Sequence, residues 1–443
     1  MKMKKIQKLT AILLSMAMIF AMTACGTEST GKKEKNGSDG ASKESALQVQ
    51  EPVTIEFWYT MSGDSETAMQ EMIAEFNKNN EYGITVNGTY QGNYEKNLSK
   101  VVASYGTSTA PTIALLASGG FEQLYDAGGL ADLAPYVERD NWDLENIPEE
   151  LRYYMQYNEG EVIEFPYLVS TAVIYYNKAL MTSEPTTLEE WVASAKAITS
   201  KDSSVYGMFL NLDEGFIQRP IIKTLSGTDF TTADGNGPAC LDDDSLLTFL
   251  KDWKSWIDDG YCMELSTTDM KNKMLNAFST GKLASFIQTS GNMAQIQSVA
   301  DEAGIDLGVA KMVGYGEYAA PLGGGGLVVL DSATQQEQAA AWEFIKFLYE
   351  DSNVVKIHKV SSYLPFTYSA LESDEVAAYW EENPGFKVAS EQMEYGTYNG
   401  WSLYLSEWRT QIGNCMTSVL IDGSMTPEGA IAYLRKQAVV IFP

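Results

Sequence analysis

The chain has 443 residues, of which 45% are apolar and 20% charged, a balance typical of globular proteins. At about 150 residues per domain, this length predicts two or three domains or two large lobes. The chain carries 31 basic and 59 acidic residues, for a net charge of −28, so we expect no nucleic-acid partner, because phosphate backbones would be repelled. It has one histidine, His358, which excludes multi-histidine metal sites. We expect no metal and no cofactor.

The N-terminus has the pattern of an exported lipoprotein. Four lysines among the first eight residues precede an apolar run from Ala11 to Ala24. This run is shorter than the ~20 residues needed to span a bilayer, but it suits a signal peptide. It ends in MTACG (22–26), which resembles a bacterial lipobox with methionine in place of the usual leucine. We expect a signal peptide over 1–24 and lipidation of Cys25, palmitate included. The alternative is a free cysteine beside an ordinary cleavage site.

Residues 25–50 predict a flexible tether. They are polar, contain no aromatic residue and cannot bury enough apolar surface to become ordered. A tether of this length reaches roughly 25–30 Å, which suits a globular body held close to a membrane. We therefore expect the chain to be lipid-anchored at the extracellular face of the cell membrane.

Three cysteines follow Cys25: Cys240, Cys262 and Cys415. No CxxC spacing occurs, so zinc and thioredoxin-like redox sites lack support. An odd number also argues against a disulfide framework. We expect buried, free cysteines, with a Cys240–Cys262 disulfide as the alternative.

The first part of the body alternates predicted strands and helices. Residues 54–58 predict a strand, and Met69, Met72, Ile73 and Phe76 then mark one helix face, with Gly83 closing that helix. A strand is expected from Ile84. Asn93 is then expected to cap a helix whose inward face is Leu98, Val101, Val102 and Tyr105.

A buried parallel strand is expected over 111–117, followed by a helix that ends at Gly128-Gly129. A second unit begins with a strand at 173–176. Thr187 and Glu190 form a predicted capping box for the next helix, and a further helix is expected over 335–349. This alternation predicts an open α/β sheet, in which ligands bind at the carboxyl ends of strands.

Several segments in order resemble an extracellular solute-binding protein of an ABC importer, closest to the sugar-binding family that includes glycerol-3-phosphate-binding proteins. They are TIEFWYTMSG (54–63), YQGNYEKNLSKVVAS (90–104), AVIYYNKAL (172–180), PTTLEEW (185–191), PLGGGGLVVL (321–330), EQAAAWEFIKFL (337–348), SSYLPFT (361–367) and ENPGF (382–386). Each string alone is weakly specific. Their number and order carry the resemblance, which covers essentially the whole chain.

The resemblance implies an α/β, two-lobe periplasmic-binding-protein-like fold of type II, with lobes joined by crossover strands and a ligand cleft between them. Lobe one is expected over 51–166 plus 316–358, and lobe two over 167–315 plus 359–443. The chain would pass between the lobes near 165–176, 313–324 and 358–365. Hinge closure would trap the ligand, and the closed form would dock on the transmembrane subunits of an ABC permease.

Four candidate ligand-binding residues follow from their positions along the chain. Trp58 and Tyr59 end a strand before a turn, where aromatic faces can stack on sugars, with core packing as the alternative. Ser290 precedes a helix and offers donors. Gly324 lies in the run 323–326, which lacks the Lys-Ser/Thr of a phosphate loop. Close approach of the backbone to a ligand, or bending at the hinge, would explain these glycines.

Other candidates come from the resemblance. Tyr94, Ser170 and Tyr363 match positions that contact ligand in glycerol-3-phosphate-binding relatives. Ser118 takes the place of a ligand-binding glutamate, so that glutamate is missing. Thr171, next to Ser170 in the chain, offers a second hydroxyl group for ligand binding.

Two further positions depart from the relatives. Asp213 and Phe216 fall where those relatives have two tryptophans, and a carboxylate at Asp213 would suit vicinal hydroxyls, with a solvated turn as the alternative. Trp401 falls where they carry an arginine. Because a phosphate dianion needs cationic or backbone donors, these changes favour a neutral carbohydrate over glycerol-3-phosphate.

The sequence therefore predicts a monomeric substrate-binding lipoprotein of an ABC importer that captures a mono- or oligosaccharide. One alternative is a glycerol-3-phosphate or glycerophosphodiester-binding protein of the same family. Another is a sugar-sensing receptor component without transport. A glycoside hydrolase would need two carboxylates about 5–10 Å apart across a cleft, and the resemblance provides no such pair, so we expect no enzyme activity.

Overall fold

The computed structural model describes residues 47–212, 216–398 and 400–443, and Glu44–Pro443 form one compact unit. The predicted signal peptide, Cys25 and all but the last residues of the predicted tether lie outside the described residues, as does Asp213.

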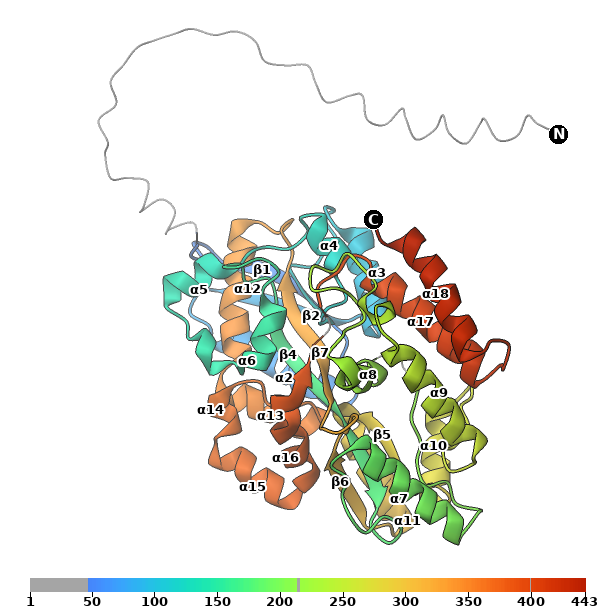
Figure 1. Cartoon of the computed structure of the whole chain (residues 1–443). Coiled ribbons are helices and arrows are strands. Elements are labelled where there is room, and N and C mark those ends of the chain that lie inside the picture. Colours follow the sequence, from blue (N-terminus) through green and yellow to red (C-terminus); the bar gives the residue numbers. More distant parts are fainter. Residues whose placement is uncertain (1–46, 213–215, 399) are drawn as a thin grey trace, which may run out of the picture. The chain divides into compact units, whose positions relative to one another are not determined.

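A mixed sheet runs through this unit (Figure 1). Its strand order is β2-β1-β3-β7-β4-β5, β6 also pairs with β4, and β8 pairs with β7. Strands β1, β2 and β3 are parallel, as the alternation of strands and helices predicts, whereas β7 runs antiparallel to β3 and to β4. The strands are β1 (Val53–Tyr59), β2 (Ile84–Tyr90), β3 (Ile113–Ala117), β4 (Phe165–Asn177), β5 (Ser285–Thr289), β6 (Leu307–Lys311), β7 (Ala320–Val329) and β8 (Gly396–Thr397).

Strand β4 connects two halves of the sheet. Residues Phe165 to Thr171 pair with β7, whereas Ala172 to Asn177 pair with β5 and β6. The first half of the sheet thus comprises β2, β1, β3, β7 and the start of β4, and the second half comprises the end of β4, β5 and β6. The change of partner falls inside 165–176, where the resemblance implies a crossing. All 13 residues of β4 are buried, which explains its nearly continuous apolar sequence.

Helices pack against both halves (Figure 1). The α-helices are α2 (Asp64–Asn79), α3 (Tyr94–Ser104), α4 (Glu122–Asp126), α5 (Ala134–Asp140), α6 (Glu149–Arg152), α7 (Leu188–Lys201), α8 (Gln218–Ser226), α9 (Ser245–Asp258), α10 (Met270–Ser279), α11 (Met293–Ala303), α12 (Gln335–Leu348), α13 (Asp351–Ser361), α14 (Tyr368–Leu371), α15 (Asp374–Glu382), α16 (Pro384–Glu391), α17 (Leu405–Leu420) and α18 (Pro427–Ile441). The 3-10 helices are η1 (Leu144–Asn146), η2 (Tyr153–Met155), η3 (Ala239–Leu241), η4 (Ser290–Asn292) and η5 (Gln392–Tyr395).

The apolar spacing located the buried face of α2 well. Met69, Met72, Ile73 and Phe76 of α2 are all buried, as their i, i+3, i+4, i+7 spacing predicts. Helix α12 occupies the predicted range and starts with a complete capping box in which Thr334 and Glu337 bond each other's backbone. That capping box was not predicted.

Three local details differ from the prediction. Helix α2 ends at Asn79, before Gly83, because Asn80 has an extended backbone and its side-chain amide donates to the Phe76 and Ile84 carbonyls. Helix α3 turns Asn97 inward, where its amide bonds the Leu115 carbonyl at 2.9 Å, while Val102 is 55% exposed. In α7 only half of the expected capping box forms, since the Glu190 carboxylate accepts bonds from Thr186 rather than from Thr187.

Two hydrophobic clusters support the unit. The larger includes the fully buried Trp191, Trp253, Trp342 and Trp408. The smaller cluster consists of eight buried residues, with Trp58 and Trp401 packed partly against it; its members are Val101, Ala114, Leu116, Phe121, Leu124, Ile163, Val328 and Leu330.

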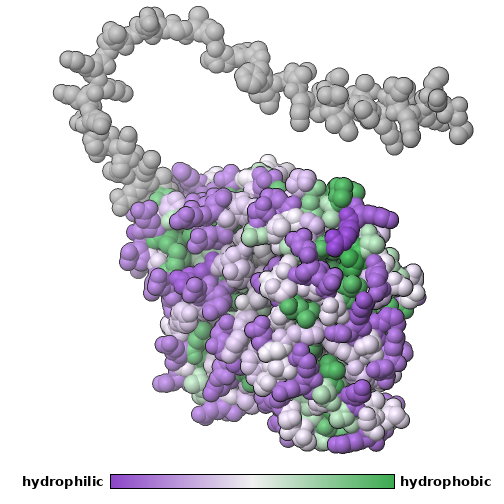
Figure 2. Space-filling view, in the orientation of Figure 1, coloured by the Kyte–Doolittle hydropathy of each residue, from purple (hydrophilic) through white to green (hydrophobic). Residues whose placement is uncertain are grey.

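The three cysteines of the body are free and buried, as expected, and burial raises the pKa values of their thiols. The face drawn in Figure 2 is mainly hydrophilic, with hydrophobic residues in small separate groups. In the described part of the chain, no helix is both long and apolar enough to cross a bilayer.

Candidate ligand cleft

A small cavity of about 240 Å³ lies where the end of β1 meets the start of α3 and the segment after α13. It contains two residues that the resemblance assigns to ligand binding, Tyr94 and Tyr363, from segments far apart in the sequence. Hydroxyl groups and the amide of Asn93 make its wall polar. The lining residues are Thr60, Met61, Ser62, Ser65, Asn93, Tyr94, Leu168 and Tyr363.

Tyr94 is held here by the start of α3. The Asn93 side chain accepts a bond from the Lys96 amide and caps the helix, as predicted, so Tyr94 becomes its first residue. The hydroxyl of Tyr94 is buried beside Tyr363 and has no well-formed hydrogen bond to any described residue. Burial raises the pKa of Tyr94, so the group remains a neutral hydroxyl that can both donate and accept.

The glycines of β7 make room for side chains that converge on this region. A Cβ at Gly323 would lie 2.6 Å from the Phe216 ring, and one at Gly325 would lie 2.5 Å from the Tyr94 hydroxyl. At Gly324 the backbone has φ +125° and a Cβ would meet the Leu168 carbonyl. At Gly324 the group that approaches the glycine backbone is therefore the Leu168 carbonyl of this chain. Ligand contact at Gly324 stays a prediction.

A buried carboxyl group lies next to these glycines. The hydroxyl of Ser118, which follows β3, donates to Oε1 of Glu164, and a Cβ at Gly326 would lie 2.0 Å from that oxygen. Glu164 is fully buried, and its Oε2 has no partner among the described residues. Burial raises the pKa of Glu164 to about 8, and the charge of Glu122 adds to the effect.

Aromatic rings border the same region. Trp401, predicted to bind ligand, packs against rings from α4 and its neighbourhood, with centroids at 5.8 Å from Phe121 and 5.0 Å from Tyr157. Its indole Nε1 is buried without a partner among the described residues. Next to Phe121, burial raises the pKa of Glu122 to about 7, although the charge of Arg409 acts against it. Rings and unpaired polar atoms in one place suit a sugar, which has apolar C–H faces and many hydroxyls.

A buried ion pair lies near Tyr153, whose hydroxyl also bonds the backbone of Trp401. Arg219 of α8 contacts Asp229 at 2.7 Å and donates to the Thr397 hydroxyl at 3.1 Å. Burial alone would raise the pKa of Asp229, but Arg219 and Lys223 lower it. Beside Thr397, the ring of Tyr398 stacks on Tyr153 with centroids 3.3 Å apart.

The other predicted residues lie in different surroundings. Trp58 is half-buried against the smaller cluster. Tyr59 is only 1% exposed, and its hydroxyl accepts a bond from Gln70 of α2 at 2.7 Å. Ser170 is buried in β4 opposite Gly323, and Ser290 is buried with its hydroxyl accepting the Thr171 amide at 3.2 Å.

Sequence reasoning missed several groups at this site. Glu164 was not singled out, although a lone acidic residue inside the apolar stretch 162–166 is a usable signal. Arg219, Tyr153 and Tyr157 carry no motif and are brought here only by tertiary packing.

The unpaired polar atoms are the main evidence for a binding site. Buried polar atoms usually have hydrogen-bond partners, because an unpaired one costs about 1–3 kcal/mol. Several such atoms among the described residues belong to this region, and they include donors and acceptors. They are the Tyr94 hydroxyl, Glu122 Oε1, Glu164 Oε2, Trp401 Nε1, Gln218 Oε1 and Arg219 Nε.

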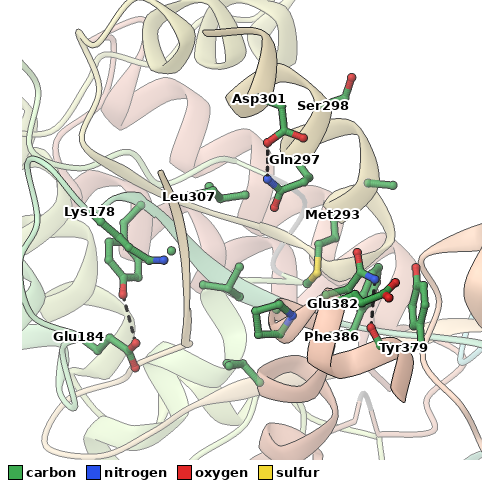
Figure 3. A pocket seen from close by; sticks show the side chains of 18 of the residues that line it. Lys178, Glu184, Met293, Gln297, Ser298, Asp301, Leu307, Tyr379, Glu382 and Phe386 are labelled. Atoms are coloured by element: carbon green, nitrogen blue, oxygen red, sulfur yellow. Dashed lines mark hydrogen bonds between the residues drawn. The ribbon is translucent and has the colours of Figure 1, made fainter. Parts of the chain in front are cut away.

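A larger groove of about 800 Å³ lies elsewhere, on the second half of the sheet (Figure 3). None of the predicted ligand-binding residues lines its described wall. Its rim carries one lysine, Lys178, and four carboxylates, from Glu184, Asp301, Glu302 and Glu382. Within the described residues, no group of three or more His, Cys, Asp or Glu side chains could hold a metal ion.

Comparison with solved structures supports the fold. UgpB from Mycobacterium tuberculosis in complex with glycerophosphocholine has a TM-score of 0.76 and 21% identity, covering 88% of this chain and 98% of its own. The sugar-binding protein MalE from Xanthomonas citri has a TM-score of 0.76 and 19% identity, covering 88% and 97%. The GacH receptor of Streptomyces glaucescens has a TM-score of 0.73 and 21% identity, covering 89% and 99%. The predicted two-lobe α/β fold is confirmed.

Sequence comparison supports the resemblance. The sn-glycerol-3-phosphate-binding periplasmic protein UgpB of Escherichia coli (strain K12) is 26% identical over 378 residues, which cover 78% of this chain and 81% of that protein. UgpB of Salmonella typhimurium (strain LT2) is 26% identical over 374 residues, covering 77% and 80%. The profile of one family matches residues 71–387, well over half of the chain. The chain belongs to the family of bacterial extracellular solute-binding proteins.

Proposed function

We propose that this chain is the substrate-binding lipoprotein of an ABC importer and captures a neutral carbohydrate, a mono- or oligosaccharide. The carrying observation is the set of unpaired buried polar atoms around Tyr94, Glu164 and Trp401, set among aromatic rings. A sugar would supply hydroxyls to these atoms and C–H faces to the rings. Relatives named for sugars, such as MalE of Xanthomonas citri, support this class.

A phosphate-bearing ligand is the second candidate. UgpB proteins are named for sn-glycerol-3-phosphate, and one solved relative holds glycerophosphocholine. Arg219 lies at the site and would be the natural cation for a phosphate. Asp229, at 2.7 Å, already balances the charge of Arg219. Arg219 would therefore attract a phosphate dianion less strongly, which favours a neutral sugar as the ligand.

Delivery to the transmembrane subunits of a permease follows from the family's transport role. Two lobes, 51–166 plus 316–358 and 167–315 plus 359–443, would close as a monomer over the ligand. The change of partner along β4 between Thr171 and Ala172 supports a hinge there. A sugar-sensing receptor without transport would use the same closure, and neighbouring permease genes would distinguish the two roles. Because the family consists of solute-binding proteins, we expect no catalysis.

A thermal-shift screen tests the ligand class. The protein is the compact unit 44–443, and the compounds are maltose, maltotriose, D-tagatose, sn-glycerol-3-phosphate and glycerophosphocholine. A ligand at 100 times its Kd adds about 2.7 kcal/mol of stability. We expect a rise in Tm with a sugar and none with the phosphate compounds. A rise with only the phosphate compounds would contradict a neutral ligand, and no rise with any compound would remove the support for this function.

The membrane anchor is a separate part of the proposal. Cys25 in MTACG would carry lipid and hold the body at the extracellular face of the membrane. Replacing Cys25 by serine should abolish incorporation of labelled palmitate and release the chain from the membrane fraction, whereas Cys415→Ala should leave both unchanged. Labelling that persists in Cys25→Ser would disprove the anchor.

A further inference from the structure

The carboxyl group of Glu164 lies over Gly326, on the face of the sheet that carries the smaller cluster. Its neighbour Phe165 packs against Trp142 and Trp342 in the larger cluster. Adjacent residues of an extended chain point to opposite faces, so Glu164 points the other way, over Gly326. There the Ser118 hydroxyl donates to Oε1 of Glu164, and Ser118 is itself half-buried at the end of β3.

The surroundings of Glu164 contain no compensating cation among the described interactions. Three titratable groups interact electrostatically with Glu164: Glu122 from α4, Tyr94 from α3 and Tyr349 after α12. The Tyr349 hydroxyl is engaged with the Pro166 carbonyl. Burial and the charge of Glu122 raise the pKa of Glu164 to about 8, so the carboxyl group carries a proton at neutral pH.

The hydrogen bond to Ser118 gives the two oxygens of Glu164 different roles. Oε1 accepts the Ser118 hydroxyl, which leaves Oε2 as the O–H donor. Glu164 is fully buried, and its Oε2 has no acceptor among the described residues. A donor without an acceptor is costly unless a ligand completes it.

We propose that Glu164 determines ligand specificity: its Oε2 donates a hydrogen bond to a ring oxygen of the bound carbohydrate. This inference rests on the proposed function. The resemblance implies that a ligand-binding glutamate is missing at Ser118, after β3. Glu164, from the segment before β4, brings a carboxyl group to that same place. A site that hydrogen-bonds a substrate oxygen discriminates strongly against analogues that lack it.

The test compares sugar binding as a function of pH, using the unit 44–443 and maltose, maltotriose and D-tagatose as uncharged probes. For wild type we expect a constant Kd up to about pH 8 and about a tenfold rise per pH unit above it, because ionised Glu164 cannot donate. Glu164→Gln keeps a donor that does not titrate, so its Kd should stay flat and near the wild-type value at neutral pH. Glu164→Leu should weaken binding about tenfold or more at every pH.

Two measurements keep the proposal falsifiable. Glu122→Gln is the matched control, because it removes the neighbouring carboxyl group and should retain a rise of Kd at high pH. In the ligand-free protein at pH 7, infrared spectroscopy should show the C=O stretch of a protonated carboxyl group that is missing in Glu164→Gln. Absence of that band in wild type would overturn the proposal.

The remaining outcomes separate this inference from the function on which it rests. Sugar binding with a Kd that is equally flat in wild type and Glu164→Gln would overturn the role of Glu164 and leave the proposed function intact. If no sugar binds, the proposed function fails, and the ligand bond of Glu164 falls with it even if the infrared band is present.

Discussion

Individual buried side chains near the sheet fall into two groups that burial alone does not distinguish. Tyr59 and Ser290 are buried with satisfied polar groups, whereas Tyr94, Glu164 and Trp401 bury atoms that have no well-formed hydrogen bond to a described residue. The second group is the one a ligand would complete. The sequence singled out Tyr94 and Trp401 but also Tyr59, because a residue's type and its place at the end of a strand do not reveal whether its hydroxyl is already bonded.

Aromatic contacts should contribute measurably to sugar affinity. We expect Tyr363→Ala and Trp58→Ala each to weaken binding of a sugar found in the screen by roughly 1–3 kcal/mol, the range for a buried stacking anchor. Isothermal titration calorimetry on folded variants measures this. Tyr82→Ala is the control, since Tyr82 is 48% exposed and lies outside the cavity. Unchanged affinity in a folded variant would assign that residue to core packing.

The buried Glu164 should also make folding stability depend on pH without any ligand. Its pKa is raised from 4.5 to about 8 in the folded chain, so the unfolded chain loses the proton first. Relative to Glu164→Gln, wild type should be most stable below about pH 4.5 and lose up to ~1.4 kcal/mol per pH unit as the pH rises to about 8. Urea unfolding of both proteins at several pH values measures the difference. A constant difference would mean that folding does not shift the pKa of Glu164.

At the scale of elements, β7 organises the site through its glycines. Each glycine from 323 to 326 leaves space that another group fills: Phe216, the Leu168 carbonyl, Tyr94 and Glu164. The sequence pattern marked this run as a place of close approach, but it could not say what approaches, because those groups come from segments at least 100 residues away in the chain. The pairing of β7 with both β3 and β4 brings them together.

Replacing Gly324 should destabilise the fold strongly. Gly324→Ala combines a φ of +125° with a Cβ placed against the Leu168 carbonyl, and we expect a loss of more than ~3 kcal/mol in the free energy of unfolding. The control is Gly106→Ala, where φ is +73° and nothing lies within 4 Å, so only backbone strain of about 1–2 kcal/mol applies. Similar losses in the two variants, measured by urea unfolding, would contradict a packing role for Gly324.

For the whole molecule, function depends on how its two lobes meet. Trp401, from the segment before α17, packs on Phe121 and Tyr157. Phe121 follows β3 and Tyr157 precedes β4, so both belong to segments next to the first half of the sheet. A ligand that also touches both sides would favour the closed form by its differential affinity for that form. These cross-contacts therefore belong to the closed state that we propose captures the sugar.

Closure should be visible in solution. We expect a saturating sugar to lower the radius of gyration of the unit 44–443 in small-angle X-ray scattering. Trp401→Ala should raise it in the ligand-free protein, because contacts that favour closure are lost. Tyr433→Ala, on the outer side of helix α18 where the ring is 36% exposed, should leave the ligand-free value unchanged. A radius that does not respond to a bound sugar would contradict hinge closure.

The amino-acid sequence by itself determined the alternation of strands and helices from β1 to α4, the buried face of α2, the end of β4 at 173–176 and, through the resemblance, the family. These depend on local periodicity and on strings of adjacent residues. Tertiary structure alone decided that Glu164 meets Ser118, that Arg219 is neutralised by Asp229, and that Trp401 joins the rings of α4. Such meetings depend on strand pairing and on packing between distant segments, which leave no periodic trace in the chain.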